Sequence, residues 1–204
     1  MQFLFSSAPA TFILLLANVM IGVYTMFVDP SVVNKWSFKP HKVSQRKEIG
    51  GFVTAAFVHG GLAHLAFNMI TLYFFGPLVE GILGTWKFLT IYFGAELAAS
   101  AVTYWRHKDN PKYSSVGASG AISGVLFAFI LFDPFAMLGV MLVIPMPAIV
   151  FAVLYIVLSI HAARQGGGFV AHEAHIGGAL GGVVLTILLY PAVLGIFLRQ
   201  LGVG

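Results

Sequence analysis

The sequence lacks cysteine entirely and contains few charged residues. With no Cys among its 204 residues, disulfides, thiolate nucleophiles and thiolate metal ligands are excluded. Charged residues make up only 9% of the chain, against about 25% in soluble domains. In contrast, 59% of the residues are hydrophobic and the mean hydropathy is +0.93. This balance excludes a soluble globular domain and predicts a multi-pass membrane protein, which we expect in the cell membrane.

The few positive charges are concentrated in two segments. Of the 11 Lys and Arg residues, 8 lie within 35–47 and 106–112, and the formal net charge is +4. Aromatic residues alternate with the lysines of the first segment, which is typical of a chain lying in the membrane interface. We therefore expect the lipid bilayer as a partner, through contact with anionic headgroups, and no binding of nucleic acid.

Apolar runs predict an all-α membrane protein, a bundle of six transmembrane helices in a single domain over residues 1–204. Several runs approach the roughly 20 residues that cross a bilayer. The expected helices are 9–28, 52–79, 85–105, 116–132, 137–160 and 171–190. The fourth is short, about 25 Å at 1.5 Å per residue, so we expect a dip in the bundle above one of its ends.

Proline and glycine mark the fifth expected helix and the connection that follows it. Pro145 and Pro147 remove backbone donors, which predicts a kink or a late start of this helix. The consecutive Gly166, Gly167 and Gly168 predict a flexible loop that acts as a lid.

The second expected helix is unusually polar. It contains His59, His64 and Asn68, and the last two are four residues apart, so they share one helix face. Polar groups inside a membrane are costly and point by default to a functional site. Two interpretations stay open here: a functional His/Asn face, or polar groups that only hydrogen-bond to neighbouring helices.

A serine between glycines opens the fourth expected helix. Ser119 follows Gly117 and Ala118 and precedes Gly120. In this setting its hydroxyl and its own backbone N–H are able to approach a bound carbonyl, as acyl transfer requires. The alternative is helix packing, because Gly120 and Gly124 have the spacing at which two membrane helices touch. The serine alone does not decide between the two.

A histidine on a glycine-rich face opens the sixth expected helix. Gly178 and Gly182 follow His175 at i+3 and i+7, so this face is bare of side chains and packs closely against another helix. The natural partner is the small-residue face of the fourth helix. This packing would bring the His175 imidazole next to the Ser119 hydroxyl, with His175 as general base for a Ser119 nucleophile.

An acyl-transfer site also needs donors for an oxyanion. Asn68, His64 and the backbone N–H of Ser119 are the candidates, and one good donor contributes about 3 to 4 kcal/mol. We expect neither a metal nor a cofactor in this chemistry.

These residues resemble the rhomboid family of intramembrane serine proteases. The resemblance rests on the segments His64–Asn68 (HLAFN), Gly117–Gly120 (GASG) and Ala174–Gly178 (AHIGG), which fall in the matching helices and order. It implies a Ser119–His175 dyad, with no third acid, that cleaves transmembrane segments of protein substrates. The oligomeric state stays open.

The resemblance also implies supporting roles for other residues. Gly117, Gly120 and Gly178 belong to the motifs, and His59 would brace the first loop. The fifth helix and the loop after it would form the lateral entry for substrate and its lid.

Other functions remain as alternatives. A metalloprotease would start from His172-Glu173-Ala174-His175, but zinc proteases use HExxH with histidines at i and i+4, and here the second falls at i+3. A catalytically inactive rhomboid-like protein that binds membrane helices is a second alternative. A small transporter with a proton path through His64, Glu96 and His175 is a third.

Overall fold

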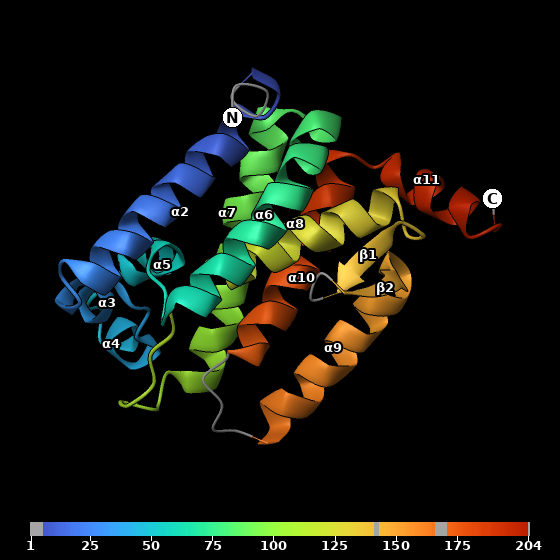
Figure 1. Cartoon of the computed structure of the whole chain (residues 1–204). Coiled ribbons are helices and arrows are strands. Elements are labelled where there is room, and N and C mark those ends of the chain that lie inside the picture. The colour runs from blue at the N-terminus through green and yellow to red at the C-terminus, as the bar shows by residue number, and fades with distance from the viewer. Residues whose placement is uncertain (1–5, 141–142, 166–170, 204) are drawn as a thin grey trace.

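Long helices dominate the computed structural model, which describes residues 6–140, 143–165 and 171–203. Three helices are long and apolar enough to cross a bilayer, namely α2 (Pro9–Phe27), α6 (Leu62–Leu83) and α10 (His172–Leu189). The bundle is completed by α7 (Thr85–His107), α8 (Ser119–Phe132) and α9 (Ala148–Gln165), as Figure 1 shows. The expected all-α membrane bundle of six helices is confirmed.

Shorter elements connect these helices. Those between α2 and α6 are α3 (Ser31–Trp36), α4 (Pro40–Ser44), α5 (Gly51–Thr54) and the 3-10 helix η1 (Ala55–Phe57). Those after α8 are β1 (Met137–Val140), β2 (Ile144–Pro147) and, following α10, α11 (Val193–Gln200). The strands form an antiparallel hairpin with Met137 opposite Pro147. Figure 1 shows this hairpin and α3 to α5 on opposite sides of the bundle.

The core of the bundle is built around α8. Every residue from Gly120 to Phe132 is buried, and the helix packs against α6, α7 and α10. A helix that is apolar on all sides belongs in such a core. Ser119, the first residue of α8, therefore lies where one end of the core meets the connecting loops.

Glycines bring α8 and α10 into direct backbone contact. A Cβ added to Gly178 would collide with the carbonyl oxygen of Gly120, and one added to Gly182 would collide with the backbone of Gly124. Membrane helices use small residues to approach in this way. The contact sets the start of α10 against the start of α8, as the spacing of the glycines predicted.

A buried carboxylate joins three helices. Glu80 of α6 accepts hydrogen bonds from the backbone N–H groups of Ala10 (3.0 Å) and Thr11 (2.8 Å). It also accepts the hydroxyls of Thr11 and Thr85, both at 2.8 Å. Ala10 and Thr11 lie in the first turn of α2, where helix N–H groups have no intrahelical acceptor. Glu80 thus accepts hydrogen bonds from the N–H donors at the start of α2 and connects this helix to α6 and α7.

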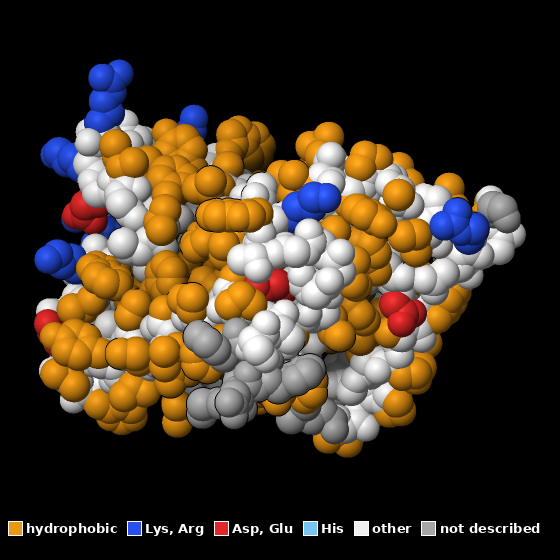
Figure 2. Space-filling model, turned by 90° about the horizontal axis from the view of Figure 1, so that it is seen from above, with side chains coloured by type: hydrophobic (Ala, Val, Ile, Leu, Met, Phe, Trp, Pro, Cys, Tyr) orange, Lys and Arg blue, Asp and Glu red, His pale blue; other side chains and the backbone are white. Residues whose placement is uncertain are grey.

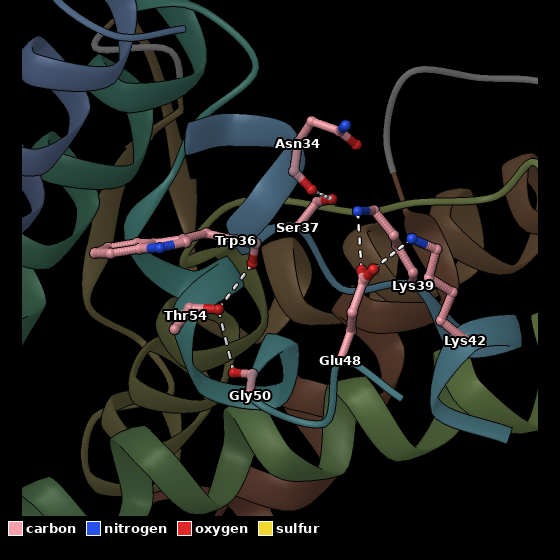
Figure 3. A network of polar contacts seen from close by, with 8 residues as sticks. All are labelled: Asn34, Trp36, Ser37, Lys39, Lys42, Glu48, Gly50 and Thr54. Atoms are coloured by element: carbon pink, nitrogen blue, oxygen red, sulfur yellow. Dashed lines mark hydrogen bonds and ion pairs between the residues drawn. The ribbon is translucent and has the colours of Figure 1, made fainter. Parts of the chain in front are cut away.

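Polar contacts brace the loop between α2 and α6 (Figure 3). Glu48 pairs with Lys42 and with Lys39, the latter at 3.0 Å, and these hydrogen bonds lower the pKa of Glu48 below its ordinary value. The Thr54 hydroxyl donates to the carbonyl of Trp36 at 2.9 Å. These contacts hold α3, α4 and α5 to one another.

The same loop is also tied to the residues that precede α8. The N–H of Phe38 donates to the Ser115 carbonyl at 2.9 Å, and the N–H of Ser115 donates back at 3.0 Å. The Phe38 side chain is buried. The first loop therefore supports the approach to Ser119.

The outside of the bundle is largely hydrophobic. Figure 2 shows hydrophobic side chains over most of one face, with most of the visible Lys and Arg at one edge. Large apolar side chains such as Trp86 and Trp105 are among the most exposed. Such a surface suits a protein surrounded by lipid.

The second and fourth helices begin later than the sequence led us to expect. The second starts at Leu62 instead of residue 52, because Gly60 and Gly61 interrupt the apolar run and the residues before them form α5 and η1. His59 consequently lies in the connection ahead of α6 and not inside it. The fourth helix starts at Ser119, three residues late, so that Gly117 belongs to the preceding loop.

The expected helix over 137–160 was wrong in its first half, over 137–147. This stretch forms the β1–β2 hairpin, and α9 begins only at Ala148. Pro145 and Pro147 lie in β2, so the late start, and not a kink, is the consequence of the two prolines. The expected lid at 166–168 lies outside the described residues.

Candidate active site

Ser119 and His175 meet where α8 and α10 begin. Ser119 is the first residue of α8, and His175 lies in the first turn of α10. The His175 Nε2 atom is 2.9 Å from the Ser119 Oγ atom, within hydrogen-bond distance. A nucleophile and its general base require this contact. The structure brings together the two residues that the motifs singled out.

The approach to Ser119 depends on a glycine. Gly117 has a φ of +111°, a conformation in which an L side chain is strained. A Cβ at this position would lie 2.5 Å from the Cε1 atom of His64. The Gly117 N–H also donates to the Ala55 carbonyl at 2.8 Å. Gly117 thus lets the His64 ring pack against the backbone just before the serine.

A cavity of about 520 Å³ adjoins the pair. Its lining includes His64, Asn68, Ser119 and His175. The Asn68 Nδ2 atom is buried and has no hydrogen-bond partner among the residues that the structure describes. The backbone N–H of Ser119, at a helix start, is a donor without an intrahelical acceptor. The cavity and its immediate surroundings therefore contain groups that are able to donate hydrogen bonds.

His59 supports this wall of the cavity from behind. It is 1% exposed, and its ring meets the His64 ring edge-on, with centroids 5.1 Å apart. His59 is not part of the cavity lining. Its position suits a residue that holds the His64 ring in place.

Glu96 has a partner at the start of α8. Its Oε2 atom accepts the N–H of Ala121 at 3.0 Å. This N–H belongs to the first turn of the helix, where donors lack intrahelical acceptors. Glu96, for which the sequence offered no partner, fixes the first turn of α8 to α7.

Glu173 of the HEAH segment binds side chains outside that segment. Its Oε1 atom accepts the Tyr113 hydroxyl at 2.7 Å and lies 2.8 Å from the His107 Nε2 atom. The His107 and Tyr113 rings stack 3.6 Å apart. Burial first, and then Glu173, raise the pKa of Tyr113 above its ordinary value. This cluster ties the start of α10 to the end of α7, and no set of three metal-ligating side chains occurs within the described ranges.

Tyr155 of α9 is a neighbour of the pair that the sequence analysis missed. Its ring stacks on the His175 ring with centroids 5.9 Å apart and planes 20° apart, and its hydroxyl is 2.6 Å from the Ser123 Oγ atom. The position of Tyr155 depends on how α9 docks, which local sequence does not encode. The one available signal was Ser123, a polar residue one turn after Ser119 in an otherwise apolar helix.

Fold and site together define a class of protein: a multi-pass helical membrane protein with a Ser–His pair beside a cavity in its bundle. A model of the rhomboid domain family matches residues 46–192, which is more than half of the chain. The chain therefore belongs to the rhomboid family.

Similar proteins carry the family name. The chain is 29% identical over 142 residues to RHOMBOID-like protein 12, mitochondrial, of Arabidopsis thaliana, covering 62% of this chain and 42% of that protein. It is 33% identical over 137 residues to Presenilin-associated rhomboid-like protein A, mitochondrial, of Danio rerio (64% and 35%). It is 27% identical over 194 residues to Rhomboid protein 1, mitochondrial, of Saccharomyces cerevisiae (88% and 54%). The chain thus spans about a third to a half of the length of these relatives.

Proposed function

We propose that the protein is an intramembrane serine endopeptidase that uses a Ser119–His175 dyad to cleave transmembrane segments of protein substrates, within or near the bilayer. The observation that carries the proposal is the 2.9 Å contact between Ser119 Oγ and His175 Nε2, beside a cavity whose lining includes His64 and Asn68. Membership of the rhomboid family supports the same reaction.

The proposed reaction begins when Ser119 Oγ attacks the carbonyl carbon of the scissile peptide bond. The hydroxyl proton passes to His175 Nε2, and the carbonyl oxygen becomes an oxyanion that accepts hydrogen bonds from Asn68, His64 and the Ser119 N–H. Collapse breaks the C–N bond, and His175 returns the proton to the leaving amine. A water molecule then repeats the sequence on the acyl-enzyme, which releases the acid product and restores the serine.

The first test is labelling of the detergent-purified protein with a fluorophosphonate, which forms a covalent bond only with an activated serine. We expect wild type to label, and Ser119→Ala and His175→Ala to lose labelling while keeping the thermal unfolding of wild type. Ser44→Ala, which changes an exposed serine of α4, is the matched control and should label as wild type does. A folded wild-type protein that does not label would contradict the proposal and favour a helix-binding protein or a transporter.

The site of cleavage gives a second test. Reconstituted in vesicles with a model single-span substrate, the wild type should generate two fragments, and mass spectrometry should place the cut within or next to the span. A cut only in soluble loops would argue against cleavage of membrane segments.

The location in the cell membrane remains a prediction. Being a multi-pass membrane protein follows from the helices and the family, whereas three relatives are named as mitochondrial. Fractionation of cells that express a tagged chain tests the prediction, and recovery in an organelle membrane would refute it.

A further inference from the structure

Tyr155 links the peripheral helix α9 to the Ser–His pair. Figure 1 shows α9 at the edge of the bundle, with α10 between it and α7. The lipid-facing side of α9 is apolar and exposed, for example at Val153 and Val157. The opposite side carries Tyr155, whose ring stacks on His175. The Phe127 ring of α8 packs against Tyr155 as well, with centroids 5.6 Å apart.

The direction of the hydrogen bond between Tyr155 and Ser123 follows from the donors available. The Ser123 hydroxyl donates to the Ser119 carbonyl at 2.7 Å, and a serine hydroxyl has only one proton. The Tyr155 hydroxyl, 2.6 Å from Ser123 Oγ, must therefore be the donor in their contact. A continuous chain of hydrogen bonds then runs from α9 through Ser123 to the backbone of Ser119.

The two contacts of Tyr155 reach both members of the pair. Its ring limits how the His175 ring turns, since two stacked rings exclude other orientations from the space that they share. Its hydroxyl acts on the first turn of α8 through Ser123. If α9 moves away, the His175 ring loses a neighbour, and the turn that carries Ser119 loses its tether at the same time.

We propose that Tyr155 is a positioning residue that makes the alignment of Ser119 and His175 depend on the docking of α9. Docked α9 holds the pair in its 2.9 Å contact, and displaced α9 leaves the serine unactivated. The inference rests on the proposed function and adds to it a regulation of the same site by a helix at the edge of the bundle.

The test compares two readouts. One is the rate of labelling by a small fluorophosphonate, which reports on serine activation. The other is kcat and KM for a single-span substrate in vesicles, which also includes entry into the site. A residue that only controls entry changes the second readout and leaves the first unchanged, whereas a positioning residue changes both and acts on kcat.

Four variants separate the ring from the hydroxyl. Tyr155→Phe keeps the ring and should slow labelling about five- to tenfold, the effect of one hydrogen bond. Ser123→Ala should slow labelling by at least as much, and the double variant should be no slower than Ser123→Ala, because both changes remove the same link. Tyr155→Leu loses ring and hydroxyl and should slow labelling about thirtyfold. Each loss should appear in kcat with little change in KM.

Tyr73 of α6 provides the matched control. It is 51% exposed on the lipid-facing side, so Tyr73→Phe and Tyr73→Leu repeat the chemical changes far from the pair and should label as wild type does. If Tyr155→Leu is folded by thermal unfolding and labels at the wild-type rate, the inference is wrong. Effects of Tyr155→Phe and Ser123→Ala that multiply in the double variant would also overturn it, because they would not share one hydrogen bond.

A structural readout keeps the inference separate from the proposed function. The native chain has no cysteine, so nitroxides attached to Leu158→Cys of α9 and Leu97→Cys of α7, both exposed positions, report the distance between the helices. Tyr155→Phe should broaden this distance distribution toward longer values, and an unchanged distribution would refute the link. A wild type that does not label contradicts the proposed function, while the distances still decide whether Tyr155 holds α9.

Discussion

Replacing Asn68 by alanine should separate activity from stability. The Asn68 side chain is buried, and its Nδ2 atom has no partner in the described structure. A buried donor without an acceptor costs about 1–3 kcal/mol, so Asn68→Ala removes an unfavourable group along with the contacts of its side chain. We expect these effects to offset each other and the melting temperature to stay within a few degrees of wild type.

The effect on the reaction should be large. Removing one oxyanion donor lowers kcat by about a hundredfold to a thousandfold, or about 2.7 to 4 kcal/mol. His64 and the Ser119 N–H remain in Asn68→Ala, which places the expected loss near a hundredfold. The loss should appear in kcat, with KM nearly unchanged, because the hydrogen bond forms only as the charge develops.

Asn18 allows a matched comparison. This asparagine is also fully buried, but it lies in α2, and its Nδ2 atom donates to the Leu14 carbonyl at 2.8 Å. Asn18→Ala should destabilise the protein by about 1–2 kcal/mol through the lost hydrogen bond and the space left behind. Its kcat at a temperature well below unfolding should equal that of wild type.

The assay combines cleavage kinetics in vesicles with thermal unfolding of the same preparations. The reasoning is refuted if Asn68→Ala keeps the wild-type kcat. It is also refuted if Asn68→Ala loses activity only in proportion to stability, as a structural residue would. A kcat loss in Asn18→Ala would show that the comparison measures packing in general.

Two further predictions concern the bundle itself. Glu80→Ala leaves two N–H donors at the start of α2 without their acceptor. Because each buried donor left without a partner costs about 1–3 kcal/mol, the free energy of unfolding should fall by roughly 3 to 5 kcal/mol. An unfolding titration in mixed micelles measures this change, and a loss below about 1 kcal/mol would contradict the prediction. Gly178→Ala places a methyl group against the Gly120 carbonyl, so it should lower the free energy of unfolding by about 1–3 kcal/mol and reduce fluorophosphonate labelling. Gly81→Ala is the control, because nothing lies within 4 Å of the added Cβ, and it should leave both stability and labelling unchanged. Equal behaviour of the two variants would refute the close packing of α8 on α10.

The part of the site that could be predicted is the part that depends on the spacing of residues along single helices. The interval from His64 to Asn68 fixes a shared helix face, and the glycines after His175 leave that side of α10 bare. These local patterns predicted the contact between Ser119 and His175, although α7 also has small residues and packs against the other glycines of α10. The structure gives that contact with a 2.9 Å distance.

The elements that the sequence did not reveal depend on tertiary contacts or on breaks within apolar runs. Residues 52–61 are as apolar as a spanning helix, and only the glycine pair before Leu62 marks where α6 begins. The prolines of β2 predicted an interruption of the expected helix, but whether the chain forms a kinked helix or a hairpin there depends on pairing with β1. The contact of Tyr155 with Ser123 depends on the docking of a whole helix, so no local sequence pattern predicts it.

The buried polar residues of this protein differ in whether the fold itself supplies their hydrogen-bond partners. Glu80 and Glu96 both accept backbone N–H groups at helix starts, so their polar oxygens are used within the fold. Asn68 differs, because its Nδ2 atom is buried without a hydrogen-bond partner in the described structure, and the residue borders the cavity that contains Ser119. Leaving such a donor unpaired is costly inside a bilayer, and the cost is offset only if something else supplies the acceptor. Under the proposed reaction, a substrate carbonyl that becomes an oxyanion would be that acceptor.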